Sequence, residues 1–234
     1  MLLITLISCN DAVDYAKKKF KYASIKRKFS RSAKNCELQN KNNLHHCARW
    51  NYLTSEEFSE TVMDGINRLN PPLKNSESFF ELGVRTGAAI QVILRNRKNL
   101  SFSGSDFSEE AINVARKTFP ENADNFVVQD MTKKHDKIKD NTYDHVFSFG
   151  ALGMYLKKTD MIKAIREAVR ITKPGGSLLF THFVEPNGER VDSILYKVEI
   201  SFWQKELPQY GVEDIKIEVM KHQGDRHQIF CRKK

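Results

Sequence analysis

The chain has 234 residues, of which 40% are hydrophobic and 29% charged, and its formal net charge is +9. This length suits one α/β domain with an extension, and no apolar run reaches the roughly 18 residues that a membrane-spanning helix needs. Residues 1–50 contain 11 of the 38 Lys and Arg but only 3 of the 29 Asp and Glu, so the rest of the chain is nearly balanced in charge. The net charge is therefore poor evidence that the folded domain binds nucleic acid.

The cysteines give no sign of a metal site or a disulfide scaffold, because their spacing matches neither. We therefore expect reduced thiols, no bound metal and a cytoplasmic protein. Residues 2–7 are apolar apart from Thr5, but the run is short, no basic segment precedes it, and Asn10-Asp11 follows it in place of a cleavage site. These features argue against a signal peptide.

The N-terminal arm, residues 1–49, is rich in Lys and Arg interleaved with Phe20, Tyr22, Ile25 and Phe29. Their spacing is only loosely helical, and the charge density indicates a solvated, partly mobile or partly disordered helix that forms an N-terminal helical extension. Two functional alternatives stay open, an arm that faces RNA or lipid and a lid that folds over an active site. We place a single domain over residues 50–234.

A helix is predicted after Thr54, because Thr54 and Glu57 have the spacing of a capping box. Apolar residues then recur on one helical face up to Leu69, and Pro71-Pro72 ends the helix.

Strands and helices then alternate regularly along the chain. Short apolar runs predict strands at residues 78–82, 101–105, 125–129, 143–149 and 177–183, and helical patterns fall at residues 88–97, 108–119 and 159–171. This order predicts a mostly parallel sheet with right-handed crossovers and helices on both faces.

The C-terminal part is predicted to be one helix and one hairpin. Residues 190–207 carry apolar residues at helical spacing. Residues 212–220 and 226–232 alternate apolar and polar residues about Gly224-Asp225, which predicts an antiparallel hairpin that closes one edge of the sheet.

Acidic residues stand at the ends of successive strands, where open α/β sheets bind ligands. Glu81 precedes Gly83 and Gly87, two glycines that allow close backbone approach in a strand-turn-helix connection. Asp106 follows the second strand and is able to accept ribose hydroxyls, and Asp130 follows the third and suits an adenine amino group. The neighbouring side chains Phe107 and Met131 suit a purine face.

These motifs resemble the class I S-adenosylmethionine-dependent methyltransferases. The glycine-rich first motif is Glu81-Leu82-Gly83-Val84-Arg85-Thr86-Gly87, followed by Asp106, Gln129-Asp130-Met131, the fourth strand ending at Ser148, and Arg170-Ile171-Thr172-Lys173-Pro174-Gly175-Gly176 before the fifth. Arg85 replaces the usual central glycine, and we expect it to point to solvent or to the cofactor's carboxylate. The resemblance covers roughly residues 50–232 and implies a Rossmann-like seven-stranded sheet.

The resemblance also implies an S-adenosylmethionine cofactor and in-line methyl transfer. Cofactor contacts are expected from Glu81, Gly83, Gly87, Asp106, Phe107, Asp130, Met131 and Ser148. Acceptor contacts are expected from Trp50, Tyr52, Tyr155, His182 and Glu185, and His182 and Tyr155 are candidate catalytic residues. His182 is a candidate general base because its ordinary pKa is near neutrality, although methyl transfer does not always require a base.

The acceptor is expected to be a small molecule, since Phe149-Gly150-Ala151-Leu152 is not the Asn/Asp-Pro-Pro-aromatic signature of many enzymes that methylate nucleic acids or protein amides. One alternative is an RNA or protein methyltransferase that uses the basic arm. Another is an NAD-dependent oxidoreductase, because an acid at the position of Asp106 also suits the ribose of that cofactor. We expect a monomer or homodimer.

Overall fold

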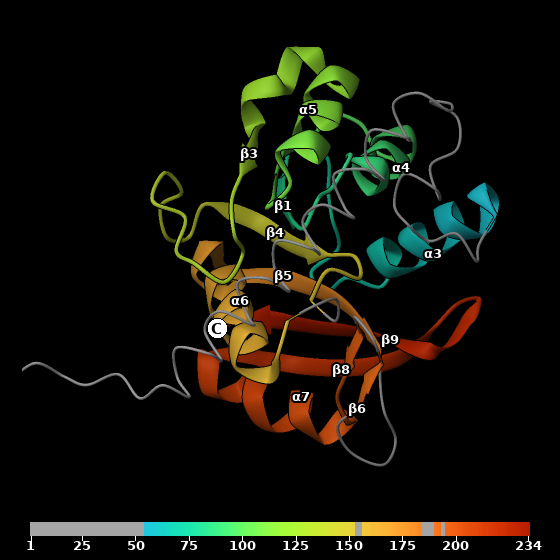
Figure 1. Cartoon of the computed structure of the whole chain (residues 1–234), viewed down its shortest axis with the longest axis vertical. Helices are drawn as coiled ribbons and strands as arrows, with labels where there is room; N and C mark the ends of the chain where they lie inside the picture. Colours follow the sequence, from blue (N-terminus) through green and yellow to red (C-terminus); the bar gives the residue numbers. More distant parts are fainter. Residues whose placement is uncertain (1–53, 153–155, 184–189, 193–194) are drawn as a thin grey trace, which may run out of the picture.

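The computed structural model describes residues 54–152, 156–183, 190–192 and 195–234. At its centre lies a seven-stranded sheet with the order β3-β2-β1-β4-β5-β9-β8 (Figure 1). The parallel strands are β1 (Ser78–Leu82), β2 (Ser101–Asp106), β3 (Phe126–Val128), β4 (Tyr143–Ser148) and β5 (Thr172–Phe183). The hairpin of β8 (Val212–Met220) and β9 (Gln223–Lys233) is antiparallel, with β9 beside β5. The predicted seven-stranded, mostly parallel architecture is confirmed.

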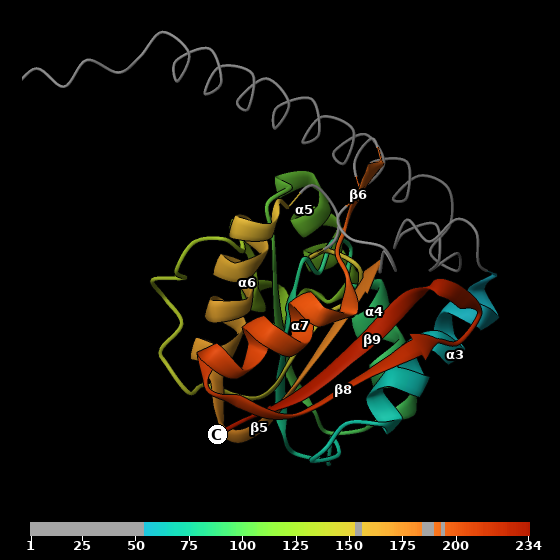
Figure 2. The same cartoon turned by 90° about the horizontal axis from the view of Figure 1, so that it is seen from below.

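Helices cover both faces of the sheet, as the alternation predicted. On one face, α3 (Ser55–Asn67), α4 (Ala88–Asn96) and α5 (Glu109–Thr118) bury Val62, Ile90 and Ile112. On the other face lie α6 (Lys158–Ile171) and α7 (Ile200–Glu206) (Figure 2). They pack around Ile165 and Trp203 in a second hydrophobic core. Burial on both sides explains why successive residues of the central strand β1 are buried from Phe79 to Leu82.

Local capping determines where two of these helices begin. The Thr54 hydroxyl accepts from the Glu57 N–H at 3.2 Å, and the Glu57 carboxylate accepts from the Thr54 N–H at 2.8 Å, so the predicted capping box is present. Ser108 caps α5 by accepting from the Ala111 N–H at 3.3 Å. These bonds satisfy backbone donors that a helix start leaves without partners.

Two details of the C-terminal part differ from the sequence prediction. Residues 190–207 are not one helix: β6 (Arg190–Asp192) and β7 (Leu195–Lys197) form a two-stranded sheet, and α7 starts only at Ile200 before a short 3₁₀ turn, η2 (Leu207–Tyr210). Strand pairing overrides the helical spacing there. The hairpin turns at Lys221-His222, with His222 at φ 64°, whereas Gly224-Asp225 lies inside β9.

The remaining described elements are a 3₁₀ helix, η1 (Pro120–Asn125), and connecting loops. None of the described helices combines the length and apolar character required to cross a membrane.

Candidate cofactor and acceptor site

The candidate site lies at the carboxyl ends of the central strands. In the register of the sheet, Glu81 of β1 pairs with Gly104 of β2 on one side and with Phe147 of β4 on the other. The chain continues from β1 toward β2 and returns later to β4, so the strand order reverses between β1 and β4. In open α/β sheets, ligands bind outside the carboxyl ends of the strands at such a reversal.

The glycine-rich turn of residues 83–87 is held tightly against β2. The N–H groups of Gly83 and Val84 both donate to the Ser105 carbonyl, at 2.8 and 2.9 Å. Gly83 has φ +74°, and a Cβ at this position would lie 2.3 Å from the Ala151 Cβ and 3.1 Å from the Met131 Cε. The backbone of the first motif therefore contacts the loops that follow β3 and β4. The small residue after Gly150 was a sequence signal for this contact that our prediction did not use.

Arg85 follows the turn in the left-handed conformation, at φ 51°. Its side chain is buried, so the expectation that it points to solvent is wrong. Its backbone N–H donates to the Asp106 Oδ2 at 3.0 Å. An arginine thus adopts the backbone conformation that glycine takes most easily, and a hydrogen bond to Asp106 holds it there.

Asp106 connects three segments at the end of β2. Besides the bond from Arg85, its Oδ1 accepts from the Ser108 N–H at 2.9 Å at the start of α5. Burial raises the pKa of Asp106, and the N–H groups of Ser108 and Arg85, together with the Arg85 charge, oppose that rise. Each carboxylate oxygen has a second lone pair, which leaves acceptor capacity for ligand hydroxyls.

Glu81 is a buried carboxyl group with only 3% of its surface exposed. Burial, together with the nearby Asp106, raises the pKa of Glu81 well above its ordinary value. Its Oε2 has no hydrogen-bond partner among the described residues, and the same holds for the Ser148 Oγ at the end of β4. A buried carboxyl group of this kind favours a cationic ligand group, which would pair with the ionised form.

The third motif lies in the loop after β3. The Asp130 Oδ1 accepts from the Thr132 N–H and hydroxyl, at 3.0 and 2.8 Å. Asp130, Met131 and Phe107 are all partly exposed, unlike the buried Glu81 and Asp106. The structure therefore brings the sequence-predicted cofactor residues together at the carboxyl ends of the strands. The buried carboxyl groups lie on β1 and β2, and the accessible side chains lie toward β3.

The predicted acceptor side is described only at His182. This side chain is 1% exposed, packs edge-on against Trp203 with ring centroids 5.2 Å apart, and donates from Nδ1 to the Phe183 carbonyl. Burial lowers the pKa of His182 to about 4. This environment favours a packing role. Trp50, Tyr52, Tyr155 and Glu185 lie outside the described residues.

Comparisons with known proteins agree with this geometry. Residues 79–176 match the family model described as a methyltransferase domain. A search of curated proteins found no significant match.

Several solved structures share the fold at low sequence identity. The [4+2]-cyclase SpnF superposes with a TM-score of 0.63 at 18% identity, over 75% of this chain and 80% of that chain. Phosphoethanolamine N-methyltransferase 2 of Haemonchus contortus, solved with S-adenosyl-L-methionine, gives 0.63 at 17% identity over 74% of this chain and 52% of that one. An S-adenosylmethionine-dependent methyltransferase from Clostridium acetobutylicum gives 0.58 at 12% identity, over 77% and 92%.

Proposed function

We propose that this chain, whose residues 79–176 match a methyltransferase domain, is a class I enzyme that transfers a methyl group from S-adenosylmethionine to a small-molecule acceptor. The observation that carries this proposal is the convergence of the Gly83 turn, the buried Glu81 and the tethered Asp106 at the switch point of the sheet. A glycine turn beside a buried carboxyl group whose Oε2 has no hydrogen-bond partner among the described residues suits an adenosine that bears a cationic amino-acid tail.

Each candidate residue has a chemical task in this proposal. The Glu81 carboxylate would pair with the ammonium of the cofactor, and the backbone at Gly83 and Gly87 would lie against the amino-acid tail. Asp106 would accept the ribose hydroxyls, and Asp130 the adenine amino group. Phe107 and Met131 would contact the adenine faces, and Ser148 would lie beside the cofactor at the end of β4.

The bound cofactor supplies a methyl group already activated by a sulfonium. The protein's task is then to align the acceptor with that methyl group and to exclude water. A base is needed only where the acceptor must lose a proton. Since His182 is buried against Trp203, we do not assign it that task, and Tyr155 remains a candidate on sequence grounds alone.

A small-molecule acceptor is supported by the residues after β4. Phe149-Gly150-Ala151-Leu152 lacks the Asn/Asp-Pro-Pro-aromatic signature. The phosphoethanolamine N-methyltransferase that shares the fold is named for a small acceptor. SpnF shares the fold as well but is named as a cyclase, so the fold alone does not establish methyl transfer. We further propose that residues 1–49 are an arm outside the methyltransferase domain. Deleting them distinguishes two roles for this arm: loss of turnover would favour a lid, and loss of RNA affinity with cofactor binding intact would favour a nucleic-acid-binding arm.

Thermal unfolding with added ligand tests the cofactor assignment. S-adenosylhomocysteine at about 100 times its Kd should stabilise the protein by about 2.7 kcal/mol and raise its Tm by roughly 5–10 °C. NAD should have no effect, and the reverse result would favour an oxidoreductase. Incubation of metabolite pools with methyl-labelled cofactor then identifies the acceptor, whereas labelling confined to RNA or protein would contradict the small-molecule proposal.

A further inference from the structure

The loop of residues 129–142, between β3 and β4, carries Asp130 and Met131 and contains no regular helix or strand. Such a long connection is ordered only if side chains tie it to the rest of the fold. Its apolar anchors are few: Met131 and Ile138 are partly buried against the core under α6. Polar contacts must therefore supply much of its order.

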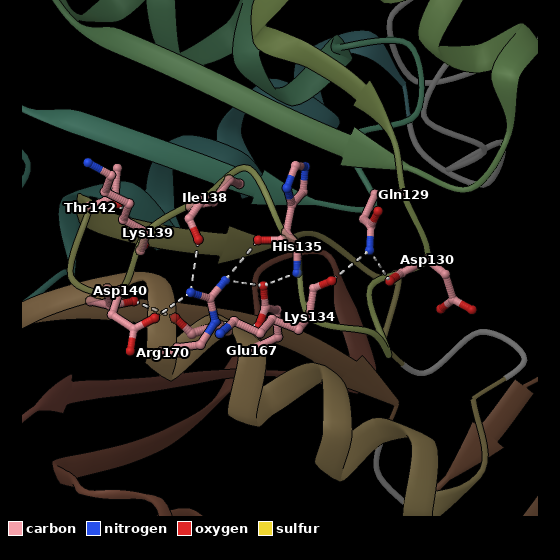
Figure 3. Close-up of polar contacts among 12 residues, drawn as sticks. Gln129, Asp130, Lys134, His135, Ile138, Lys139, Asp140, Thr142, Glu167 and Arg170 are labelled. Carbon is pink, nitrogen blue, oxygen red and sulfur yellow. Dashed lines mark hydrogen bonds and ion pairs between the residues drawn. The ribbon is translucent and has the colours of Figure 1, made fainter.

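Arg170, in the last turn of α6, supplies several of these contacts. Its guanidinium donates to both carboxylate oxygens of Glu167, at 2.7 and 2.6 Å (Figure 3). The same group donates to the Ile138 carbonyl at 2.9 Å and to the Asp140 carboxylate at 2.6 Å, and its third loop contact is the His135 carbonyl at 3.4 Å. One side chain thus contacts three points of the loop.

The contacts continue from Arg170 toward Asp130. Glu167, which Arg170 orients, accepts from the His135 N–H at 2.9 Å and is only 7% exposed. Next to His135, the Lys134 carbonyl accepts from the Gln129 side-chain amide at 3.4 Å, and that amide also donates to the Asp130 carbonyl at 3.3 Å (Figure 3). These contacts connect α6 to the segment that carries the third motif.

We propose that Arg170 is a positioning residue that, together with Glu167, holds the Asp130-Met131 segment in place to recognise the adenine of the cofactor. This inference rests on the proposed function. Lysine cannot replace Arg170, because a single ammonium lacks the planar fork that binds Glu167 with two nitrogens while reaching two loop carbonyls. Arg170 is the first residue of the Arg170-Ile171-Thr172-Lys173-Pro174-Gly175-Gly176 motif. None of the proposed cofactor contacts involves this motif, so they do not explain the arginine.

The test measures selectivity for the adenine amino group. Calorimetry gives the Kd of S-adenosylhomocysteine and of S-inosylhomocysteine, which lacks that amino group, for the full chain and its variants. The unaltered protein should prefer the adenosine compound, and Asp130→Asn should remove this preference. Arg170→Lys should reduce the preference about tenfold, the effect of losing roughly one hydrogen bond to a charged group. It should also accelerate trypsin cleavage at the loop lysines.

The matched control is Arg68→Lys, since Arg68 also binds two carboxylates, Asp64 and Glu218, but lies at the end of α3. It should leave the preference unchanged. If Arg170→Lys does not fold, Asp140→Asn removes the negative charge of one exposed partner of the same guanidinium and should lower the preference only about two- to threefold, because an exposed ion pair contributes little.

The outcomes separate this inference from the proposed function. If the unaltered protein does not bind S-adenosylhomocysteine, the proposed function is wrong. If Asp130→Asn removes the preference while a folded Arg170→Lys variant retains it, only the inference is overturned. If the unaltered protein binds both compounds equally, the Asp130 contact and the role of Arg170 are both overturned.

Discussion

Replacing Gly83 with alanine should disturb stability and cofactor binding together. The residue has φ +74°, a conformation that costs an L-residue about 1–2 kcal/mol. The added Cβ would also lie 2.3 Å from the Ala151 Cβ, and relief of such an overlap typically costs about 1–3 kcal/mol. We therefore expect Gly83→Ala to lower the free energy of unfolding by about 2–5 kcal/mol.

Gly175 provides a matched control for the backbone cost. It has φ +78°, but a Cβ there would meet nothing within 4 Å. Gly175→Ala should therefore lower the free energy of unfolding only by the conformational cost of about 1–2 kcal/mol. Urea unfolding of ligand-free protein measures both variants, and the difference between them isolates the contact with Ala151.

Two further results bear on the same contact. Ala151→Gly in the Gly83→Ala background removes the overlapping methyl group and should restore part of the lost stability. Gly83→Ala should weaken S-adenosylhomocysteine binding, whereas Gly175→Ala should leave it unchanged. Equal destabilisation by the two single substitutions would refute the close approach of the first motif to the loop after β4.

The remaining predictions concern buried ionisable groups. Because the pKa of Glu81 is raised in the ligand-free fold, the folded protein holds a proton that the unfolded chain releases, and stability falls as pH rises from the ordinary value of 4.5 to the raised one. Binding of the cofactor's ammonium should expel that proton, and calorimetry in buffers of different ionisation enthalpy detects its release. Glu81→Gln should abolish the proton release and weaken cofactor binding at least tenfold. Unchanged proton release in this variant would contradict the pairing of Glu81 with the ammonium. Asp106→Ala should remove cofactor binding and also destabilise the ligand-free protein by about 2–4 kcal/mol in urea, because the buried N–H groups of Arg85 and Ser108 lose their acceptor. His182, with its pKa lowered from 6.5 to about 4, should cost up to about 3 kcal/mol of stability as pH falls through that interval, since only the unfolded chain takes up the proton. His182→Gln should flatten this acid dependence, and a loss of turnover at neutral pH without a loss of stability would instead support the base hypothesis.

The sequence by itself determined the order of the strands and helices up to residue 183, the capping box at Thr54 and the acids at the strand ends. These features depend on residues a few positions apart, such as Thr54 with Glu57, or on the burial pattern of a single strand. Periodicity misjudged residues 190–207, because strand pairing between β6 and β7 depends on the partner segment as well as on local spacing.

Tertiary structure decided the properties of the individual site residues. The pKa of a group depends on its surroundings in the folded protein. The pKa shifts of Glu81 and His182 arise from burial by distant segments, so the sequence alone could not predict them. Arg85 takes its left-handed conformation beside Asp106, which lies 21 positions away in the sequence. Arg170 contacts Asp140 from 30 positions away. Such contacts result from the packing of whole elements, which no local pattern in the sequence encodes.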